Sequence, residues 1–437
     1  SDGRIVVAGS LLSFGGNMHF AVRQLAKNGS LDATFGVAGT TLVDLGGDRE
    51  SAAGAVVDAA GRIVVVGTSH QATTGYDVAI MRLTPDGTLD DSFGESGSLL
   101  LDLGSLEDYA YDIALDSEGQ ILVVGSVGTR DGEDTGRDFF VARFNSDGSP
   151  DITFGDQGVA FADFESGEDF GRSLVVDESG KIVAAGSSES QGFAIARFNV
   201  DGTLDSDFGS SGKVITDFGQ GPGDAYDVLV DDVGRIVVAG ATGSVTTSQW
   251  LDNPYRLSYG YSSEQRDFAL ARYDTAGNLD LSFGNDGKVV TDFGHGPDLA
   301  QGIATDSFGN IVAVGLSQQR FDGLDIALAR YISDDVLRVV HQVPEGPALA
   351  PVDFLRISFS LPVSPDSFSL DDILSFSGPD GDIVATGYQW LDAKTIELSF
   401  APQAALGDYE LVIGTSIEST EGMLLNQDHD DIQGETP

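Results

Sequence analysis

The chain has 437 residues, with 69 acidic side chains against 23 basic ones and a formal net charge of −46. A surface this acidic repels phosphate backbones and anionic lipid head groups, so neither nucleic-acid partners nor membrane-surface binding is expected. Cysteine is absent, which excludes disulfides, thiolate metal sites and cysteine nucleophiles. No apolar run approaches the ~18 residues of a membrane-spanning helix, so we expect no membrane insertion.

A phrase of the type Gly-Arg-Ile-Val-Val-Ala-Gly recurs six times along the chain. The copies begin at residues 3, 61, 119, 180, 234 and 309, so their starts lie 58, 58, 61, 54 and 75 residues apart. Such a period indicates one supersecondary unit copied along the chain, each copy burying its apolar faces against its neighbours.

One full repeat unit lies within residues 108–164. Alternating polar and apolar residues predict a first strand over 111–116, and more continuous apolar runs predict strands over 120–125 and 139–144. A compact Asp-x-x-Phe-Gly loop follows at 151–155, and a short fourth strand is expected over 158–164. Four antiparallel strands per repeat, with no helical period in any long segment, predict an all-β region built from propeller blades.

These motifs resemble the delta-60 repeat, a bacterial β-propeller-type repeat. The resemblance rests on the six glycine-bounded phrases, on Phe-Ala-Leu-Ala-Arg-Tyr at 268–273, and on Gly-x-Leu-Asp-x-x-Phe-Gly at 202–209. It covers residues 1–332 and implies an exported or cell-surface repeat domain, so an extracellular or bacterial cell-surface location is expected. The family carries no catalytic motif that could be transferred to this chain.

Counting strands leaves the array incomplete at both ends. The second and third strands occur six times, but the first and fourth strands occur five times each. A propeller closes to remove its sheet edges, so we expect residues upstream of Ser1 to complete a blade. Six four-stranded blades are expected, with seven blades or an open stack as the alternatives.

Residues 333–437 follow a different pattern. Short strands are expected over 336–341, 354–359, 383–388, 395–400 and 409–413, separated by clusters of Pro, Gly and Asp. About 100 residues of this kind suggest a β-sandwich. The stretch 352–363, followed by Phe368, Asp371 and Asp372, is similar to bacterial Ig-like modules of surface proteins. That resemblance implies an Ig-like β-sandwich acting as a spacer or stalk, with an acidic C-terminal tail.

The first candidate site is a set of carboxylates, one in each connection from a fourth strand to the next first strand. They are Asp48 or Glu50, Asp108, Asp169, Asp224 and Asp298. If the first strands line the central channel, these residues encircle one mouth of the propeller, where oxygen ligands could hold calcium as a structural ion. The alternative is that they cap backbone N–H groups in loops.

Two further segments are candidate sites. The fifth repeat is lengthened by an insertion over 243–266, whose aromatic and basic side chains are suited to a carbohydrate or protein contact. These residues are Trp250, Tyr255, Arg256, Tyr259 and Tyr261. Asn426, Asp428 and Asp430 resemble the opening of a calcium loop, although Asp431 replaces the turn glycine and Pro437 stands at the twelfth position. The alternatives are a loop packed on the blade rim and a flexible acidic tail.

Six arginines end the predicted third strands, and we interpret them as structural ion pairs repeated by duplication. They are Arg23, Arg82, Arg143, Arg197, Arg272 and Arg330.

Catalytic motifs are missing from the sequence. The five histidines have no zinc-type spacing, and no nucleophile elbow, phosphate loop or dinucleotide fingerprint occurs in a suitable context. We therefore expect a non-enzymatic exported bacterial surface protein that acts in adhesion, ligand binding or extracellular assembly. Its expected partner is a surface glycan, a protein or further copies of itself. The alternatives are a polysaccharide-active lyase or hydrolase at the propeller mouth, and a structural subunit of a filament or surface layer.

Overall fold

The computed structural model divides the chain into two compact units. The first comprises Ser1–Leu281, Asp286–Ala304 and Val312–Arg330, and the second Ser282–Asn285, Thr305–Ile311 and Tyr331–Pro437. The structure describes residues 3–13, 16–128, 136–164, 167–189, 191–231, 233–244, 265–294, 296–306, 309–319, 323–331, 339–343, 351–359, 361–405, 409–420 and 424–425. No helix among them is long and apolar enough to cross a membrane.

The described strands of the first unit form six sheets, each built from strands that are consecutive in the sequence. Four of the sheets have four strands, whereas the first and the sixth have three. The sheets are β1 (Ile5–Leu12), β2 (Met18–Leu25) and β3 (Thr40–Val43); β4 (Glu50–Val57), β5 (Ile63–Gln71), β6 (Gly75–Leu83) and β7 (Ser98–Leu101); β8 (Asp108–Leu115), β9 (Ile121–Gly128), β10 (Arg137–Phe144) and β11 (Val159–Ala162); β12 (Asp169–Val176), β13 (Ile182–Ser188), β14 (Gly192–Phe198) and β15 (Lys213–Thr216); β16 (Gly223–Val230), β17 (Ile236–Ser244), β18 (Gln265–Tyr273) and β19 (Lys288–Thr291); and β20 (Asp298–Thr305), β21 (Ile311–Gln319) and β22 (Gly323–Tyr331).

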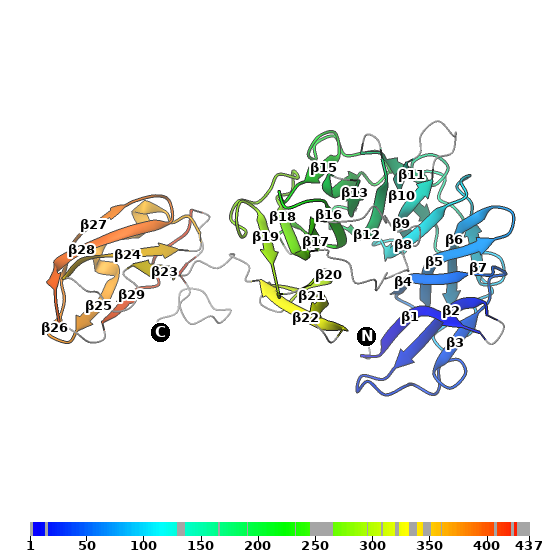
Figure 1. Ribbon diagram of the computed structural model, residues 1–437, viewed down its shortest axis with the longest axis horizontal. Helices are drawn as coiled ribbons and strands as arrows, with labels where there is room; N and C mark the ends of the chain where they lie inside the picture. The colour runs from blue at the N-terminus through cyan, green and yellow to red at the C-terminus, as the bar shows by residue number, and fades with distance from the viewer. Residues whose placement is uncertain are drawn as a thin grey trace. The chain divides into compact units, whose positions relative to one another are not determined.

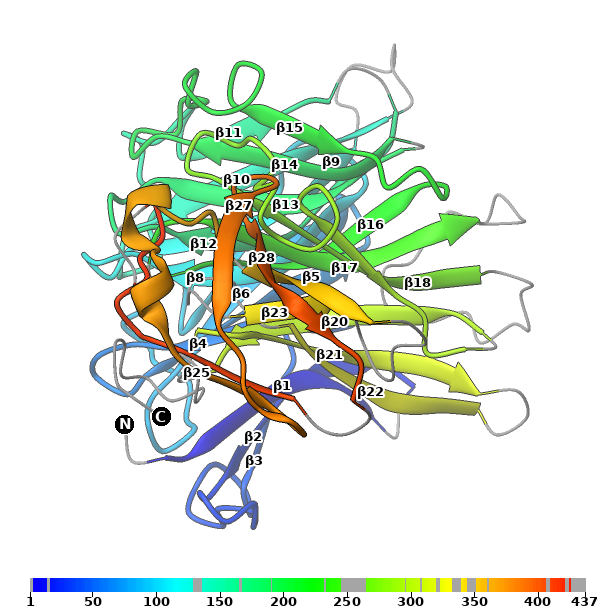
Figure 2. The same ribbon diagram turned by 90° about the vertical axis from the view of Figure 1, so that its left-hand side faces the viewer.

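This arrangement is that of a β-propeller. In Figure 1 the first strands of the complete sheets, such as β8 and β12, lie toward the middle of the array, and fourth strands such as β15 and β19 lie at its outside. Figure 2 shows β16, β17 and β18 of the fifth sheet side by side. The predicted strands of the third repeat are confirmed as β8 to β11, and their order β11-β10-β9-β8 is the expected up-and-down order.

The core lies between neighbouring sheets. Val64 and Ile80 of the second sheet pack in one buried cluster with Val123 and Phe140 of the third sheet. Similar clusters join the first sheet to the second, the third to the fourth and the fourth to the fifth. Both faces of the central sheets are therefore buried, which explains why the second and third strands read as nearly continuous apolar runs.

The glycine that ends each repeated phrase allows the first and second strands to approach closely. The first strand of the third sheet has a register shift between Ala110 and Asp112, opposite Gly125 of β9. A Cβ atom on Gly125 would lie 1.9 Å from the carbonyl oxygen of Tyr109, so no other residue fits there. In the first sheet, which has no such strand, a Cβ atom on Gly9 would meet nothing within 4 Å.

The compact Asp-x-x-Phe-Gly loop explains the repeated arginines. In the third sheet the Arg143 Nε and Nη2 atoms both lie 2.8 Å from Asp151 Oδ2, and the guanidinium carbon lies 4.7 Å from the ring centroid of Phe154. The Gly155 N–H donates to the Asp201 carbonyl oxygen in the next sheet at 2.8 Å. The prediction of repeated ion pairs is confirmed at Arg82–Asp90, Arg143–Asp151, Arg197–Asp205 and Arg272–Asp280.

At Arg23 the prediction is wrong. The equivalent main-chain N–H, which donates to a glycine carbonyl in each repeat, belongs to Gln24 in the first sheet, while Arg23 is one position out of register and exposed. Gln24 instead accepts a hydrogen bond from Arg4 Nη1 at 2.8 Å.

The second unit contains two sheets packed around one core. One sheet has the order β23-β24-β28-β27 and the other β26-β25-β29. The strands are β23 (Val339–Val343), β24 (Val352–Phe359), β25 (Ile373–Gly378), β26 (Gly381–Asp382), β27 (Ala385–Trp390), β28 (Thr395–Gln403) and β29 (Glu410–Ile413), and the single-turn 3₁₀ helices are η1 (Pro365–Ser367) and η2 (Leu370–Asp372). Phe376 of β25 and Phe400 of β28 join the sheets, with ring centroids 5.0 Å apart. The sequence pattern did not predict β25 or β26.

Candidate functional site

The connections from each fourth strand to the next first strand, which we call junctions one to five in chain order, each bury a carboxylate. At junction two, Asp108 begins β8 and its Oδ2 accepts the main-chain N–H of Leu103 at 2.7 Å. The Ser105 hydroxyl donates to Asp108 Oδ1. The same backbone contact is made by Glu50, Asp169 and Asp298, and all four side chains belong to fully buried residues. These hydrogen bonds match the loop-capping interpretation.

At junction one, the structure distinguishes Asp48 from Glu50. Glu50 occupies the repeated position at the start of β4, where it is buried. Asp48 lies exposed, with its Oδ1 2.7 Å from His70 Nδ1. Glu50, Asp108, Asp169 and Asp298 each lie in a separate cluster within their own junction, and their arrangement around one mouth stays a prediction.

Two further carboxylates approach the buried one at three of the junctions. One comes from the start of a third strand, and the other directly follows the fourth strand that pairs with it. In each cluster one ligand atom from each residue lies within 4.8 Å of the other two. The all-aspartate clusters are Asp77, Asp102 and Asp108 at junction two; Asp138, Asp163 and Asp169 at junction three; and Asp267, Asp292 and Asp298 at junction five.

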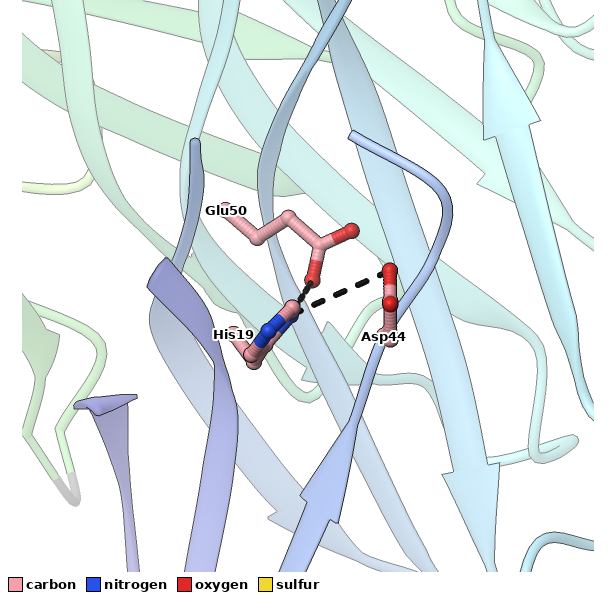
Figure 3. A group of neighbouring side chains, drawn as sticks. All are labelled: His19, Asp44 and Glu50. Carbon is pink, nitrogen blue, oxygen red and sulfur yellow. Dashed lines mark hydrogen bonds and ion pairs between the residues drawn. The ribbon is translucent and has the colours of Figure 1, made fainter. Parts of the chain in front are cut away.

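At junction one a histidine takes the place of the first aspartate. Figure 3 shows His19 between Glu50 and Asp44, with its Nδ1 3.3 Å from Glu50 Oε2 and 3.8 Å from Asp44 Oδ1. When protonated, this imidazole supplies a positive charge directly between two carboxylates.

At junction four a glycine takes that place. Gly192 has a φ of +128°, and a Cβ atom on it would lie 2.2 Å from the Thr216 carbonyl oxygen, so no aspartate can stand there. The position of Asp108 is also a glycine at this junction, because β16 begins at Gly223 and its Ala225 lies opposite Gly240 as Ala110 lies opposite Gly125. Asp224 is therefore one residue out of register with the other predicted carboxylates. It pairs with Arg266 of its own sheet, whose Nη2 atom lies 2.5 Å from Asp224 Oδ2, while Asp217 after the fourth strand is exposed.

The charges at the junctions shift the carboxyl pKa values in opposite directions. Burial, together with the nearby carboxylates Asp102 and Asp77, raises the pKa of Asp108 to about 6. Burial and the charges of Asp138 and Asp163 likewise raise the pKa of Asp169 to about 6. Burial would also favour neutral Asp224, but the neighbouring arginines hold its pKa below the usual range.

A cluster of tyrosines and arginines lies near the same ends, mostly on first strands, with Arg137 at the start of the third strand β10, and we call it the Tyr–Arg cluster. The Arg172 guanidinium carbon lies 5.6 Å from the Tyr111 ring centroid and 5.3 Å from that of Tyr226. The Arg137 guanidinium lies 5.8 Å from the Tyr109 ring and forms ion pairs with Glu107 and Glu168. Arg172, Tyr111 and Tyr226 are half-buried.

A pair of carboxyl groups lies beside this cluster. The Ser173 hydroxyl is 2.9 Å from Asp112 Oδ2 and 2.9 Å from Asp227 Oδ1. One hydroxyl has one proton to donate, so the second contact is satisfied when one of the carboxyl groups carries a proton. Burial and the charge of Asp227 raise the pKa of Asp112 to about 6. The two carboxyl groups can therefore share a proton near neutral pH.

Several predicted site residues lie outside the described residues. They are the aromatic-loop residues Trp250, Tyr255, Arg256, Tyr259 and Tyr261, and the tail residues Asn426, Asp428 and Asp430. The other members of the clusters, such as Asp77 and Asp102, were not predicted. The sequence does carry a signal for them, an aspartate that recurs at the start of the third strand and another that directly follows the fourth strand.

The family model of a domain of unknown function, DUF5122, described as a β-propeller, matches residues 1–35, 61–93, 117–154, 178–208 and 258–283. No curated protein is similar in sequence to the chain. Among solved structures, the GH43 endo-arabinanase from Bacillus licheniformis is 12% identical, with 63% of this chain and 92% of that chain covered and a TM-score of 0.34. The arabinanase Arb43A from Bacillus subtilis is 14% identical, with 64% and 95% covered and a TM-score of 0.35. A glucose dehydrogenase is 10% identical, with 76% and 97% covered and a TM-score of 0.39. Likeness at this level carries no argument about activity.

Proposed function

We propose that this chain is the binding part of an exported bacterial surface protein and that it acts without catalysis, in adhesion, ligand binding or extracellular assembly. The Tyr–Arg cluster is the observation that carries the proposal. Three successive first strands contribute Tyr111, Arg172 and Tyr226, and the Arg172 guanidinium lies over both tyrosine rings. Aromatic rings beside guanidinium groups suit a sugar ring that bears an acidic group. A surface glycan with carboxylate groups is therefore the partner that this chemistry fits best.

The acidic charge of the chain restricts binding of an acidic glycan to places such as this cluster. A net charge of −46 repels acidic polymers over most of the surface, so an acidic glycan gains contacts where arginines are concentrated. Arg137 is already neutralised by Glu107 and Glu168, whereas Arg172 forms no close ion pair among the described residues and acts on Asp224 only through its charge. We therefore expect Arg172 to contribute most of the affinity.

The test is calorimetric titration of the full chain with polygalacturonate oligosaccharides. Arg172→Gln should weaken binding by at least about tenfold, the effect of losing ~1.4 kcal/mol of binding free energy. Arg235→Gln is the matched control, because Arg235 belongs to the hairpin before β17, at the other end of its sheet, and pairs with Asp231. Equal affinity of both variants and the wild type would contradict the proposal.

A second candidate is a polysaccharide-active hydrolase or lyase, and the carboxyl pair of Asp112 and Asp227 is the observation that favours it. Their oxygens share one hydroxyl neighbour, so they lie at most about 6 Å apart, close to the spacing of glycosidase carboxyl pairs. Turnover of a glycan panel that is abolished by Asp227→Asn would establish the enzyme. A ligand retained unchanged would favour the binding module.

The finer architecture is part of the proposal. We take the first unit as a six-bladed propeller of the delta-60 type and the second as an Ig-like spacer. Six sheets in the first unit and two sheets around one core in the second support this reading.

A further inference from the structure

We propose that the three all-aspartate clusters are cation sites, each holding one calcium ion, and that His19 takes the place of the ion at junction one. The inference does not depend on the proposed function. It rests on the geometry of the clusters, on buried oxygen atoms within them, and on a comparison with junction one of the same chain.

The geometry fits a single ion in each cluster. Calcium binds oxygen at about 2.3–2.6 Å, so two oxygens on opposite sides of one ion lie about 5 Å apart. The ligand atoms in each cluster lie within 4.8 Å of one another, and all three come from carboxylates. Oxygen-only ligands favour a hard divalent cation. The three negative charges of the carboxylates exceed the two positive charges of one such ion.

Each cluster also contains one buried carboxylate oxygen that has no hydrogen-bond partner. These atoms are Asp77 Oδ1 at junction two, Asp169 Oδ1 at junction three and Asp298 Oδ1 at junction five. The three residues are 3%, 1% and 0% exposed. A buried anionic oxygen without a partner is strongly unfavourable, whereas an ion coordinated in the cluster would satisfy it.

Junction one acts as an internal comparison. There His19 stands in the place of the first aspartate, and Glu50 has no unpartnered buried oxygen among the described residues. The buried carboxylate beside a basic side chain is thus satisfied, whereas each all-aspartate cluster keeps one unsatisfied oxygen. The simplest account is that an ion stands at those three junctions where the histidine stands at junction one.

The sites differ in their surroundings. At junction three, Lys213 Nζ donates to the main-chain oxygen of Asp163 at 2.6 Å. This positive charge opposes cation binding, so we expect junction three to be the weakest of the three sites.

The test is calorimetric titration of the chelator-treated full chain with calcium chloride. Asp77→Asn, Asp169→Asn and Asp298→Asn should each lower the number of bound ions by one relative to the wild type. Asp217→Asn is the matched control, because Asp217 follows a fourth strand at junction four, where Arg266 pairs with Asp224, and it should leave the number unchanged. Circular dichroism spectra confirm that each variant is folded. Equal stoichiometry in all four variants and the wild type, or no binding at millimolar calcium, would overturn the proposal.

A second readout addresses junction two directly. Tyr76 and Tyr109 stand next to cluster residues in the sequence, and their ring centroids are 5.1 Å apart. Terbium bound in place of calcium should therefore luminesce when tyrosine is excited, and Asp77→Asn should remove most of that signal while Asp298→Asn preserves it. Signal that is equally strong in both variants would argue against an ion at junction two. Neither readout involves Arg172 or a glycan, so failure here is distinguishable from failure of the proposed function.

Discussion

Replacing Asp151 with asparagine should destabilise the first unit by an amount that depends on pH. Asp151 is 6% exposed and forms a buried ion pair with Arg143, which is 7% exposed. Its Oδ1 also accepts the main-chain N–H and the hydroxyl of Thr153. An asparagine can keep the contacts with Thr153, but it leaves the guanidinium buried without its charge partner.

The magnitude follows from the pKa of the carboxyl group. Burial alone would raise that pKa, but hydrogen bonds from Thr153 and Gln120 and the charge of Arg143 lower the pKa of Asp151 to about 2. A fall of roughly 1.8 units from an ordinary aspartate corresponds to about 2.5 kcal/mol of stability at pH 7. Removing one partner of a buried pair costs up to about 5 kcal/mol. We therefore expect a loss of about 3 kcal/mol.

The sign of the pH dependence is fixed by the lowered pKa. Stability from a depressed acid is fully present above the unfolded pKa near 4 and is lost as the pH falls through the folded pKa near 2. At pH 3 roughly half of the stability that comes from the lowered pKa of Asp151 remains. The difference in the free energy of unfolding between wild type and variant should therefore be about 1 kcal/mol smaller at pH 3 than at pH 7.

The assay is urea unfolding at pH 7 and pH 3, followed by circular dichroism. Asp156→Asn, at an exposed aspartate in the same loop, is the control and should change stability by less than about 0.5 kcal/mol at both pH values. A difference for Asp151→Asn that is the same at pH 3 as at pH 7 would refute the reasoning.

Two more substitutions test the packing of the first strands. Gly125→Ala should cost about 3 kcal/mol, because its Cβ atom would lie 1.9 Å from the Tyr109 carbonyl oxygen, whereas Gly9→Ala has open space and should be nearly neutral in thermal unfolding. Similar losses for both alanines would contradict this account. Asp112→Asn should remove a pH-dependent contribution to the free energy of unfolding. Because burial and the charge of Asp227 raise the folded pKa of Asp112 to about 6, the wild type gains stability as the pH falls from about 6 to about 4 and the variant does not. Parallel stability curves from pH 4 to 7 would count against the raised pKa.

The sequence predicted those parts of the fold that depend on short stretches of chain. The repeated phrase, the apolar third strand and the Asp-x-x-Phe-Gly loop each lie within about ten residues, and the structure confirms them as parts of one sheet. The first unit could therefore be predicted as a β-propeller from periodicity and turn residues.

The junction clusters could not be found in that way. Asp77 and Asp108 are separated by 31 residues, from 77 to 108, and meet because β6 pairs with β7 and the bridge between Tyr76 and Glu107 brings the next first strand alongside. Register decides such contacts, and an error of one residue changes the partner, as the offset between Arg23 and Gln24 shows. Asp224 shows the same effect, because β16 begins at Gly223 and Asp224 therefore lies one residue beyond the position of Asp108 and pairs with Arg266 of its own sheet.

The contact between consecutive compact loops has a consequence for how such a chain changes over generations. The Gly155 N–H and the Asp201 carbonyl oxygen belong to the main chain, as do the atoms that join Gly94 to Asp147 and Gly209 to Ala276. A link between main-chain atoms survives most side-chain substitutions, so neighbouring sheets can diverge in sequence and still fit one another. Gain or loss of a whole repeat by recombination would then bring together two loops that already match.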